Sequence, residues 1–420
     1  MIQSFSILFL LAGLLSYLNY KWIKLPNTIA LMLFGVAFTF LLILSEDIAP
    51  AFYKFFCDLV VDADFKTILL DVMLSFLLFS GAMNININAL AKEKKSVFLF
   101  ATLGVLISTA LVGVLIFGAA QLLEIPLSLI NAFLFGALIS PTDPIAVIAI
   151  LKKAGVSESL EMKIEGESLF NDGIGVVVFS GILLLLKSGT EGNDAIGGEI
   201  GMLFLEEVVG GILFGGVLGF AGYYLMRSVK ENAQLVVILS LGIAMGGYAI
   251  VSMLHMSGPL AMVVAGLIIG NKFNLAANKG KAQKSLQEIW EVLDESFNGI
   301  LFLLIGVVAH LLVFNGKYLT LGIIAFVVVL LSRFISVILP FSLLKHEAHT
   351  TLKTVSLLTW GGLRGGISLA LALSISTTED GAGELLFFIT YTVVLMSIVL
   401  QGLSIGKLVA LLYPKKIKET

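Results

Sequence analysis

The sequence predicts an all-α polytopic membrane protein, on the basis of its composition and its repeated apolar segments. Of its 420 residues, 58% are hydrophobic and 13% are charged, and the mean hydropathy is +1.03. A soluble domain carries about 25% charged and 45–50% apolar residues. A soluble globule of this size could not bury so much apolar surface, so the solvent around most of the chain must be lipid.

The same composition excludes two other classes of protein. The 26 Lys and Arg residues are balanced by 29 Asp and Glu residues, and no basic stripe is present, which argues against nucleic acid as a partner. The single cysteine, Cys57, excludes a disulfide-stabilised scaffold. No helical pattern leaves room for a soluble domain, so we expect a single membrane domain over residues 1–420.

Thirteen segments meet or approach the length of about 20 mostly apolar residues that a spanning helix needs. In chain order they cover residues 4–20, 27–45, 65–83, 97–121, 127–150, 160–186, 200–226, 233–254, 258–270, 297–314, 318–343, 352–376 and 384–412. Residues 271–296 are rich in Lys and Glu with apolar residues at helical spacing, which predicts an amphipathic helix on the membrane surface. The first segment lacks a cationic n-region and a small-residue cleavage site, so we expect a retained span.

Positive charge predicts the orientation of these spans. With the N-terminus outside and the C-terminus inside, 20 of the 26 Lys and Arg residues fall on the inner side. The outer side holds Lys54, Lys66, Lys187 and Lys317, and Arg333 and Arg364 lie within spans. Thirteen spans also give two inverted six-helix repeats, approximately residues 1–190 and 232–413, which begin on opposite sides of the membrane as an inverted-repeat transporter requires.

Two spans contain sequences that break a helix. The fifth contains Ser140-Pro-Thr-Asp-Pro144, whose two prolines remove two backbone donors and clash with the preceding turn. The twelfth contains Gly361-Gly-Leu-Arg-Gly-Gly366, in which four glycines surround one arginine. Each is the fifth span of its six-helix repeat, and such a matched pair indicates a transport site. We expect the two broken helices to cross at mid-depth around a small ion, with simple packing kinks as the alternative.

Ionisable residues near the middle of spans are the next indication of function, because each is energetically costly there. Asp172 in the sixth span lies about 18 Å along the helix from its inner end, near the middle of a ~30 Å hydrocarbon core. Asp143, Arg333 and Arg364 lie at comparable depth. The alternative reading of a single buried Asp is a structural hydrogen-bond acceptor, and each Arg has the alternative role of neutralising an acid.

The sixth span also presents several oxygens on one side, because Glu167 and Asn171, and likewise Ser168 and Asp172, are four residues apart. Counted with the central residues, Asp143, Glu167 and Asp172 against two arginines leave one negative charge, which suits one monovalent cation or one proton. Oxygen ligands without thiolate or imidazole suit hard cations.

Other features of the sequence carry less weight. We read His310, a lone histidine in the tenth span, as structural and Asp71 as interfacial. The chain contains no GxxxxGK[ST] motif, which argues against an ATP-driven pump, and no cofactor is expected. Coupling to an ion gradient, or a passive pore, remains.

Three of these motifs together resemble the cation/proton antiporter family. They are Ser140-Pro-Thr-Asp-Pro144, Glu167-Ser-Leu-Phe-Asn-Asp-Gly173 and Gly361-Gly-Leu-Arg-Gly-Gly-Ile367. Within the family they look like the NhaP-type sodium/proton antiporters and the eukaryotic sodium/hydrogen exchangers. Ser257-Gly-Pro-Leu-Ala261, followed by Ala265-Gly-Leu267, is also similar to the family's pattern.

The resemblance implies a homodimer in the plasma or inner membrane, in which a six-helix core moves against a dimerisation domain. We expect core helices around residues 65–188 and 297–412. The resemblance assigns cation and proton binding to Asp172, and it matches Asp143 and Thr142 to the unwound-helix site for Na⁺. Glu167 and Ser168 match positions at or beside the ion. The supporting residues are Asn171, Arg364 and Arg333, and Glu167 has the alternative role of pairing with Arg333.

The resulting function is exchange of Na⁺ or Li⁺ for H⁺, by alternating access and not by an enzymatic reaction. Some relatives carry two adjacent aspartates where this chain has Asn171-Asp172, and they resemble electrogenic exchangers that move two protons. One protonatable group at this pair therefore predicts electroneutral exchange. The alternatives are K⁺/H⁺ exchange, an acidic-lined cation channel, which the midplane arginines oppose, and an intramembrane aspartyl protease, whose proton sharing nearby Arg would disturb.

Overall fold

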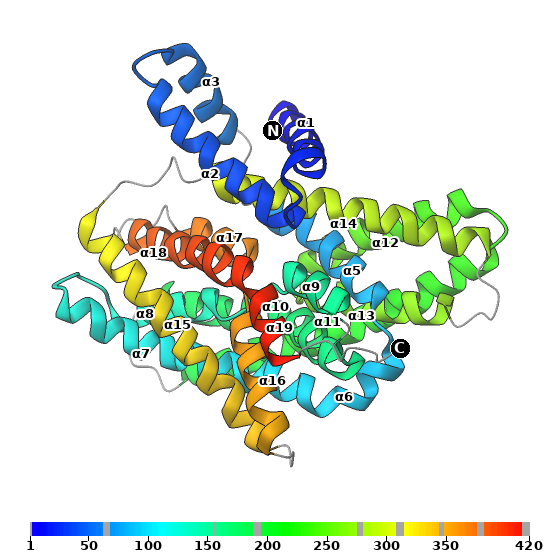
Figure 1. Ribbon diagram of the computed structural model, residues 1–420. Helices are drawn as coiled ribbons and strands as arrows, with labels where there is room; N and C mark the ends of the chain where they lie inside the picture. Colours follow the sequence, from blue (N-terminus) through cyan, green and yellow to red (C-terminus); the bar gives the residue numbers. More distant parts are fainter. Residues whose placement is uncertain are drawn as a thin grey trace, which may run out of the picture. The chain divides into compact units, whose positions relative to one another are not determined.

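The computed structural model describes residues 2–61, 68–154, 156–187, 195–274, 280–307, 315–343, 348–375 and 382–413. Within these ranges every regular element is a helix (Figure 1), so the predicted all-α class is confirmed. Contacts divide the chain into two compact units, which are considered separately below. Unit 1 comprises Met1–Ile85 and Leu205–Val313, and unit 2 comprises Asn86–Phe204 and Phe314–Thr420.

Length and composition identify seven described helical segments that are able to cross a membrane. They are Phe5–Ile23, Ile87–Leu122, Glu158–Leu186, Leu205–Ser228, Ala233–Met253, Gly316–Leu343 and Ala382–Leu412. Four shorter apolar helices and one bent pair, Leu352–Gly361 with Gly366–Ile375, accompany them. The polytopic membrane class is therefore confirmed, whereas the count of thirteen crossings, the orientation and the inverted repeats stay predictions.

Unit 1 is built from the first helices of the chain and from its middle third. Its elements are α1 (Ile2–Leu18), η1 (Asn19–Ile23), α2 (Asn27–Ser45), α3 (Pro50–Val61), η2 (Ile68–Met73), α5 (Leu74–Asn84), most of α11 (Ala195–Ser228), α12 (Ala233–Met253), α13 (Gly258–Asn274) and α14 (Lys281–Val307). The pairs α13–α5 and α14–α2 are the most extensive helix contacts of this unit.

Glycine permits the closest of these helix crossings. A Cβ on Gly35 of α2 would lie 2.6 Å from the Leu303 carbonyl oxygen of α14, and a Cβ on Gly306 would meet the Gly35 backbone. In lipid, helix association depends on packing at such small residues and on interhelical hydrogen bonds. Trp290 of α14 supplies one of these bonds, because its buried Nε1 donates to Ser240 Oγ of α12 at 3.0 Å.

Unit 2 contains both predicted helix breaks. Its elements are α6 (Ile87–Leu99), η3 (Phe100–Gly104), α7 (Val105–Leu122), α8 (Leu129–Ile139), α9 (Ile145–Ala154), α10 (Glu158–Lys187), α15 (Gly316–Leu343), α16 (Ala348–Gly361), α17 (Gly366–Ile375), α18 (Ala382–Met396), η5 (Ser397–Gly402) and α19 (Leu403–Leu412). Figure 1 shows the long helix α15 beside α7 and α18, both of which it contacts.

The two breaks lie where the sequence predicts them. The fifth predicted span divides into α8, which ends at Ile139, and α9, which begins at Ile145. The twelfth divides into α16, which ends at Gly361, and α17, which begins at Gly366, with a bend of 50° between them. Because consecutive peptide groups near each break lack helical partners, their carbonyls and N–H groups are available to other elements.

The structure corrects two predicted boundaries and adds one helix. Residues 281–307 form one continuous helix, α14, so the expected surface helix is not separate from the tenth span. The acidic residues of its first half lower the hydropathy but leave the helical hydrogen bonds intact, and Leu286 and Trp290 are buried. The fourth span begins at Ile87, where Asn86 Oδ1 accepts from the N–H groups of Asn88 and Ala89. Helix α3 was not predicted.

The crossing of α2 and α14 yields a test of packing in unit 1. We predict that Gly306→Ala lowers the free energy of unfolding by about 1–3 kcal/mol, because the added methyl group meets backbone that has no free space to move into. Gly13→Ala in α1 is the matched control, since no described heavy atom lies within 4 Å of its Cβ position. Melting temperatures in detergent provide the measurement. Equal shifts for the two variants would show that the crossing is not tightly packed.

Candidate ion-binding site

Arg364, in the break between α16 and α17, binds the end of the other broken helix. Its Nη1 donates to the carbonyl oxygens of Ile139, Ser140 and Pro141, the last at 3.1 Å. These carbonyls lie at the C-terminal end of α8, where the helix offers no further N–H groups. A cation is favoured at that end because the helix dipole is negative there. Arg364 is 2% exposed, so the positive charge that caps the C-terminal end of α8 is buried inside the protein.

The two broken segments also touch through their backbones. The N–H of Asp143 donates to the carbonyl oxygen of Leu363 at 2.8 Å. A Cβ on Gly365 would lie 2.6 Å from Asp143 Oδ2, so a glycine is required for the second segment to pass the Asp143 side chain. The predicted crossing of the two breaks is therefore present in the structure.

Helix α10 packs against the first break and satisfies its polar groups. Ser168 Oγ donates to the carbonyl oxygen of Thr142 at 2.7 Å, and Asn171 Nδ2 donates to Thr142 Oγ1 at 3.0 Å. Gly175, one turn further along α10, lies against the ring of Pro141, which leaves no room for a side chain. The sequence Glu167–Gly175 thus combines hydrogen-bonding side chains with a glycine at the point of closest approach.

On the opposite side of the first break, a cluster of hydroxyl groups fixes Ser140. Its Oγ lies 3.0 Å from Ser108 Oγ and 3.2 Å from Thr109 Oγ1, both on α7, and donates to the Gly136 carbonyl oxygen at 2.6 Å. All three hydroxyl-bearing residues are buried. The start of the break is therefore held by α7 and its middle by α10.

Glu167 and Arg333 form a buried ion pair. Arg333 Nη1 binds Glu167 Oε1, and Arg333 Nη2 donates to the Leu358 carbonyl oxygen of α16 at 3.4 Å. The two side chains are only 2% and 6% exposed. The alternative role foreseen for Glu167, pairing with Arg333, is thus the one that the geometry favours, and this carboxylate is already neutralised.

Asp143 and Asp172 differ from the other residues of the site in being partly exposed, whereas Thr142, Glu167, Ser168 and Asn171 are buried. Asp172 follows Asn171, whose amide binds Thr142 Oγ1, and Asp143 follows Thr142, so both aspartates lie where α10 meets the first break. Asn171 Oδ1 is buried without a hydrogen-bond partner among the described residues. Two carboxylates and a set of neutral oxygens thus gather around the first break.

These positions account for every predicted site residue. Thr142, Asp143, Glu167, Ser168, Asn171 and Asp172 lie together in unit 2, with Arg333 and Arg364 on the elements that cross them. His310 and the side chain of Asp71 lie outside what the structure describes, and Glu165 is partly exposed on α10. Sequence reasoning missed Ser397 and Gln401 in the last span, whose spacing of four residues in an otherwise apolar segment was the available signal.

A small cavity lies beside both arginines and Gln401 of the last span. Its volume is about 10 Å³, comparable to one water molecule, and its polar lining consists of Arg333, Thr359, Arg364 and Gln401. Arg333 Nε and Thr359 Oγ1 have no hydrogen-bond partner among the described residues. Packing is therefore incomplete where the two arginine side chains face this cavity.

Comparison with known proteins matches both the whole chain and its architecture. The family model described as "Sodium/hydrogen exchanger, transmembrane" matches residues 6–411. The Na⁺/H⁺ antiporter NhaP of Pseudomonas aeruginosa is 40% identical, covering 96% of this chain and 95% of its own. The Na⁺/H⁺ antiporter NhaH of Halobacillus aidingensis is 33% identical, covering 92% of this chain and 91% of its own.

Solved structures give the same fold. The sodium proton antiporter MjNhaP1 from Methanocaldococcus jannaschii, at pH 8, superimposes with a TM-score of 0.76 over 99% of each chain, at 20% sequence identity. The fold is that of a multi-pass membrane protein with two broken helices that cross. The chain belongs to the sodium/hydrogen exchanger family, and the NhaP-type resemblance found in its motifs is confirmed.

The buried ion pair yields a prediction for stability. Glu167→Gln and Arg333→Gln should each lower the free energy of unfolding by about 3–5 kcal/mol, because each leaves one buried charge without its partner. The double variant should lose less than the sum of the two single losses. Melting in detergent, with the parent protein alongside, measures all four species.

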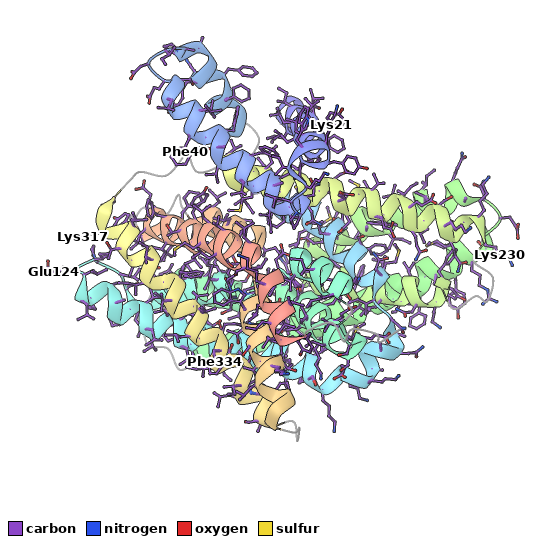
Figure 2. The ribbon with its side chains drawn as sticks, viewed as in Figure 1. Lys21, Phe40, Glu124, Lys230, Lys317 and Phe334 are labelled. Atoms are coloured by element: carbon purple, nitrogen blue, oxygen red, sulfur yellow. The ribbon has the colours of Figure 1, made fainter. Side chains whose placement is uncertain are left out.

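The matched control is an exposed ion pair in the same unit. Lys317 Nζ lies 3.9 Å from Glu124 Oε2 with side chains 59% and 90% exposed, and Figure 2 shows the two residues side by side at the ends of α15 and α7. Lys317→Gln should change stability by less than about 1 kcal/mol. Additive losses at Glu167 and Arg333, or an equal loss at Lys317, would contradict a special role for the buried pair.

Proposed function

We propose that this protein is a secondary antiporter that exchanges Na⁺ for H⁺ across the cell membrane, with both ions competing for Asp172. The observation that carries the proposal is the pair of crossed helix breaks with Asp143 and Asp172 beside them. Glu167 pairs with Arg333, so we assign the ion to Asp143 and Asp172 instead. The relatives named above are described as Na⁺/H⁺ antiporters, which supports the same cations.

The chemistry of the donors favours a monovalent cation. Two carboxylates are joined by neutral oxygens from Thr142, Ser168 and Asn171, and the Asn171 Oδ1 atom lacks a protein partner among the described residues. Hard cations bind such oxygen sets. The described residues also contain no group of three or more His, Cys, Asp and Glu side chains suited to a multivalent metal. We assign Asp172, Asp143, Thr142, Ser168 and Asn171 to the cation, and Glu167 to Arg333.

Na⁺ and H⁺ compete in this proposal because both bind the carboxylate of Asp172. Asp172 holds either a proton or, when deprotonated, the cation, and the positive charge in the site is similar in both states. Asn171 cannot take up a proton, so the Asn171-Asp172 pair binds one proton per cycle. We therefore propose a one-for-one, electroneutral exchange of Na⁺ or Li⁺ for H⁺. K⁺/H⁺ exchange is the second candidate, because K⁺ accepts the same oxygen ligands.

Alternating access requires one part of the protein to move relative to another. We propose that unit 2 is the moving part, since every residue assigned to the ion belongs to it. Unit 1 then provides the scaffold and the surface for a homodimer. Residues 68–84 and 297–307 belong to unit 1, whereas the sequence-based assignment counted them with the core.

The first test of the proposal is removal of the Asp172 charge. Asp172→Asn should abolish Na⁺-dependent proton flux in liposomes that contain a pH-sensitive dye. The amide keeps the shape of the side chain but holds neither a proton nor a full negative charge. Asp143→Asn should raise the apparent KM for Na⁺ or abolish transport, because a charged ligand is lost. Addition of Na⁺, Li⁺ and K⁺ in turn gives the selectivity.

Glu124→Gln is the matched control, since it removes an exposed carboxylate of the same unit. It should transport at the parent rate. Parent-like flux in Asp172→Asn would exclude Asp172 as the shared binding group. Flux that depends on K⁺ alone would favour the second candidate.

Stoichiometry is tested separately by clamping the membrane potential of the liposomes with K⁺ and valinomycin at 0 and about 100 mV. That potential is worth about 2.3 kcal/mol for each net charge moved. Electroneutral exchange predicts the same Na⁺/H⁺ equilibrium point at both potentials. A shift of the equilibrium point with voltage would mean that net charge is carried and that a second group, such as Asp143, also takes up a proton.

A further inference from the structure

Two polar residues in the last span, Ser397 and Gln401, reach the break between α16 and α17. Both lie in the π-helical segment η5, which joins α18 to α19 within one continuous span. Both are almost completely buried. Buried polar groups in a membrane span are costly unless they are hydrogen-bonded, so their partners define what they do.

Their partners are the backbone groups that the break leaves without helical bonds. Ser397 Oγ accepts from the N–H of Arg364 at 3.1 Å and donates to Gln401 Oε1 at 2.6 Å. Gln401 Nε2 donates to the carbonyl oxygen of Trp360 at 3.0 Å. The Arg364 N–H lies inside the break, and the Trp360 carbonyl lies in the last turn of α16. The pair therefore binds both sides of the same interruption.

A third residue of the last span strengthens this connection. Trp360 Nε1 donates to Ser404 Oγ of α19 at 2.9 Å. Trp360 is thus held through both its backbone and its indole ring. We call Ser397, Gln401 and Ser404 the last-span clamp.

The last-span clamp binds Arg364, whose side chain contacts the break between α8 and α9. Arg364 receives the clamp at its backbone N–H, and its guanidinium binds the carbonyls of Ile139, Ser140 and Pro141. Those carbonyls directly precede Thr142 and Asp143. A cavity the size of about one water molecule lies beside Arg333, Arg364 and Gln401, so packing there is incomplete and the hydrogen bonds of the clamp help to fix the backbone.

We propose that Ser397 and Gln401 are positioning residues for cation binding, acting through Arg364 on the first break. Neither residue is among the proposed ligands. Loss of the clamp therefore weakens cation binding by loosening the ligand geometry. The inference rests on the proposed function, because cation affinity is the quantity that it explains.

The test compares Ser397→Ala and Ser397→Thr in liposomes with a pH-sensitive dye. Ser397→Ala should raise the apparent KM for Na⁺ about three- to tenfold, the usual effect of one interhelical hydrogen bond, with little change in the maximal rate. Ser397→Thr keeps the hydroxyl and should restore the parent KM. Gln401→Met should raise the KM similarly, and combining it with Ser397→Ala should add little, because both remove the same clamp.

Ser374→Ala is the matched control. Ser374 lies in α17 of the same broken span, and its Oγ donates to the carbonyl of Leu371 in its own helix at 2.7 Å. It should keep the parent KM. An unchanged KM in Ser397→Ala, or equal increases in Ser374→Ala and Ser397→Thr, would overturn the proposal. If Ser397→Ala does not reach the membrane, Gln401→Met decides by the same comparison. Absence of Na⁺/H⁺ exchange in the parent itself would instead reject the proposed function.

Discussion

Arg364 satisfies the carbonyl groups that end α8, and this interaction holds the two helix breaks together. A broken helix inside a membrane exposes backbone groups that lipid cannot satisfy. Here the cation comes from one break and the carbonyls from the other, so each interruption stabilises its counterpart. The Asp143–Leu363 backbone bond and the contact of Gly365 with Asp143 then fix how the two segments cross.

The distribution of charge around this crossing follows a simple division of roles. Arg333 neutralises Glu167, and Arg364 is occupied by backbone carbonyls. Asp143 and Asp172 are partly exposed. Two carboxylates in one site are stabilised when one positive charge binds, whether it is a metal cation or a proton. The proposed competition between Na⁺ and H⁺ therefore takes place at carboxylates beside two arginines whose guanidinium groups bind Glu167 and backbone carbonyls.

Much of this arrangement is predictable from the sequence because helix breaks leave local signatures. Pro141 and Pro144 remove backbone donors, and the glycines around Arg364 lower the cost of an unwound segment. The apolar segments predict helices because lipid requires internal backbone bonding. The spacing of Glu167, Ser168, Asn171 and Asp172 predicted several oxygens on one side of this span, and Ser168 and Asn171 bind the first break.

The remaining features depend on tertiary contacts that local patterns do not encode. Arg364 binds carbonyls that are more than 220 residues away in sequence. Because an arginine in a span can equally well pair with a carboxylate, its residue type alone does not predict this partner. Gly175 is one of 42 glycines, and only its contact with Pro141 gives it meaning. Hydropathy separated residues 271–296 from the following span because acidic residues interrupt the apolar pattern, although the helix α14 runs without a break from Lys281 to Val307.

The measurement that tests the central claim most directly is the number of protons released when Na⁺ binds. Calorimetric titration of the purified protein with Na⁺, in two buffers that differ in ionisation enthalpy, reports this number without any transport step. At a pH where Asp172 is protonated, competition for one carboxylate predicts release of about one proton per Na⁺ bound, and no Na⁺-linked release in Asp172→Asn. Na⁺ binding without proton release, or the same release in Asp172→Asn, would contradict the account.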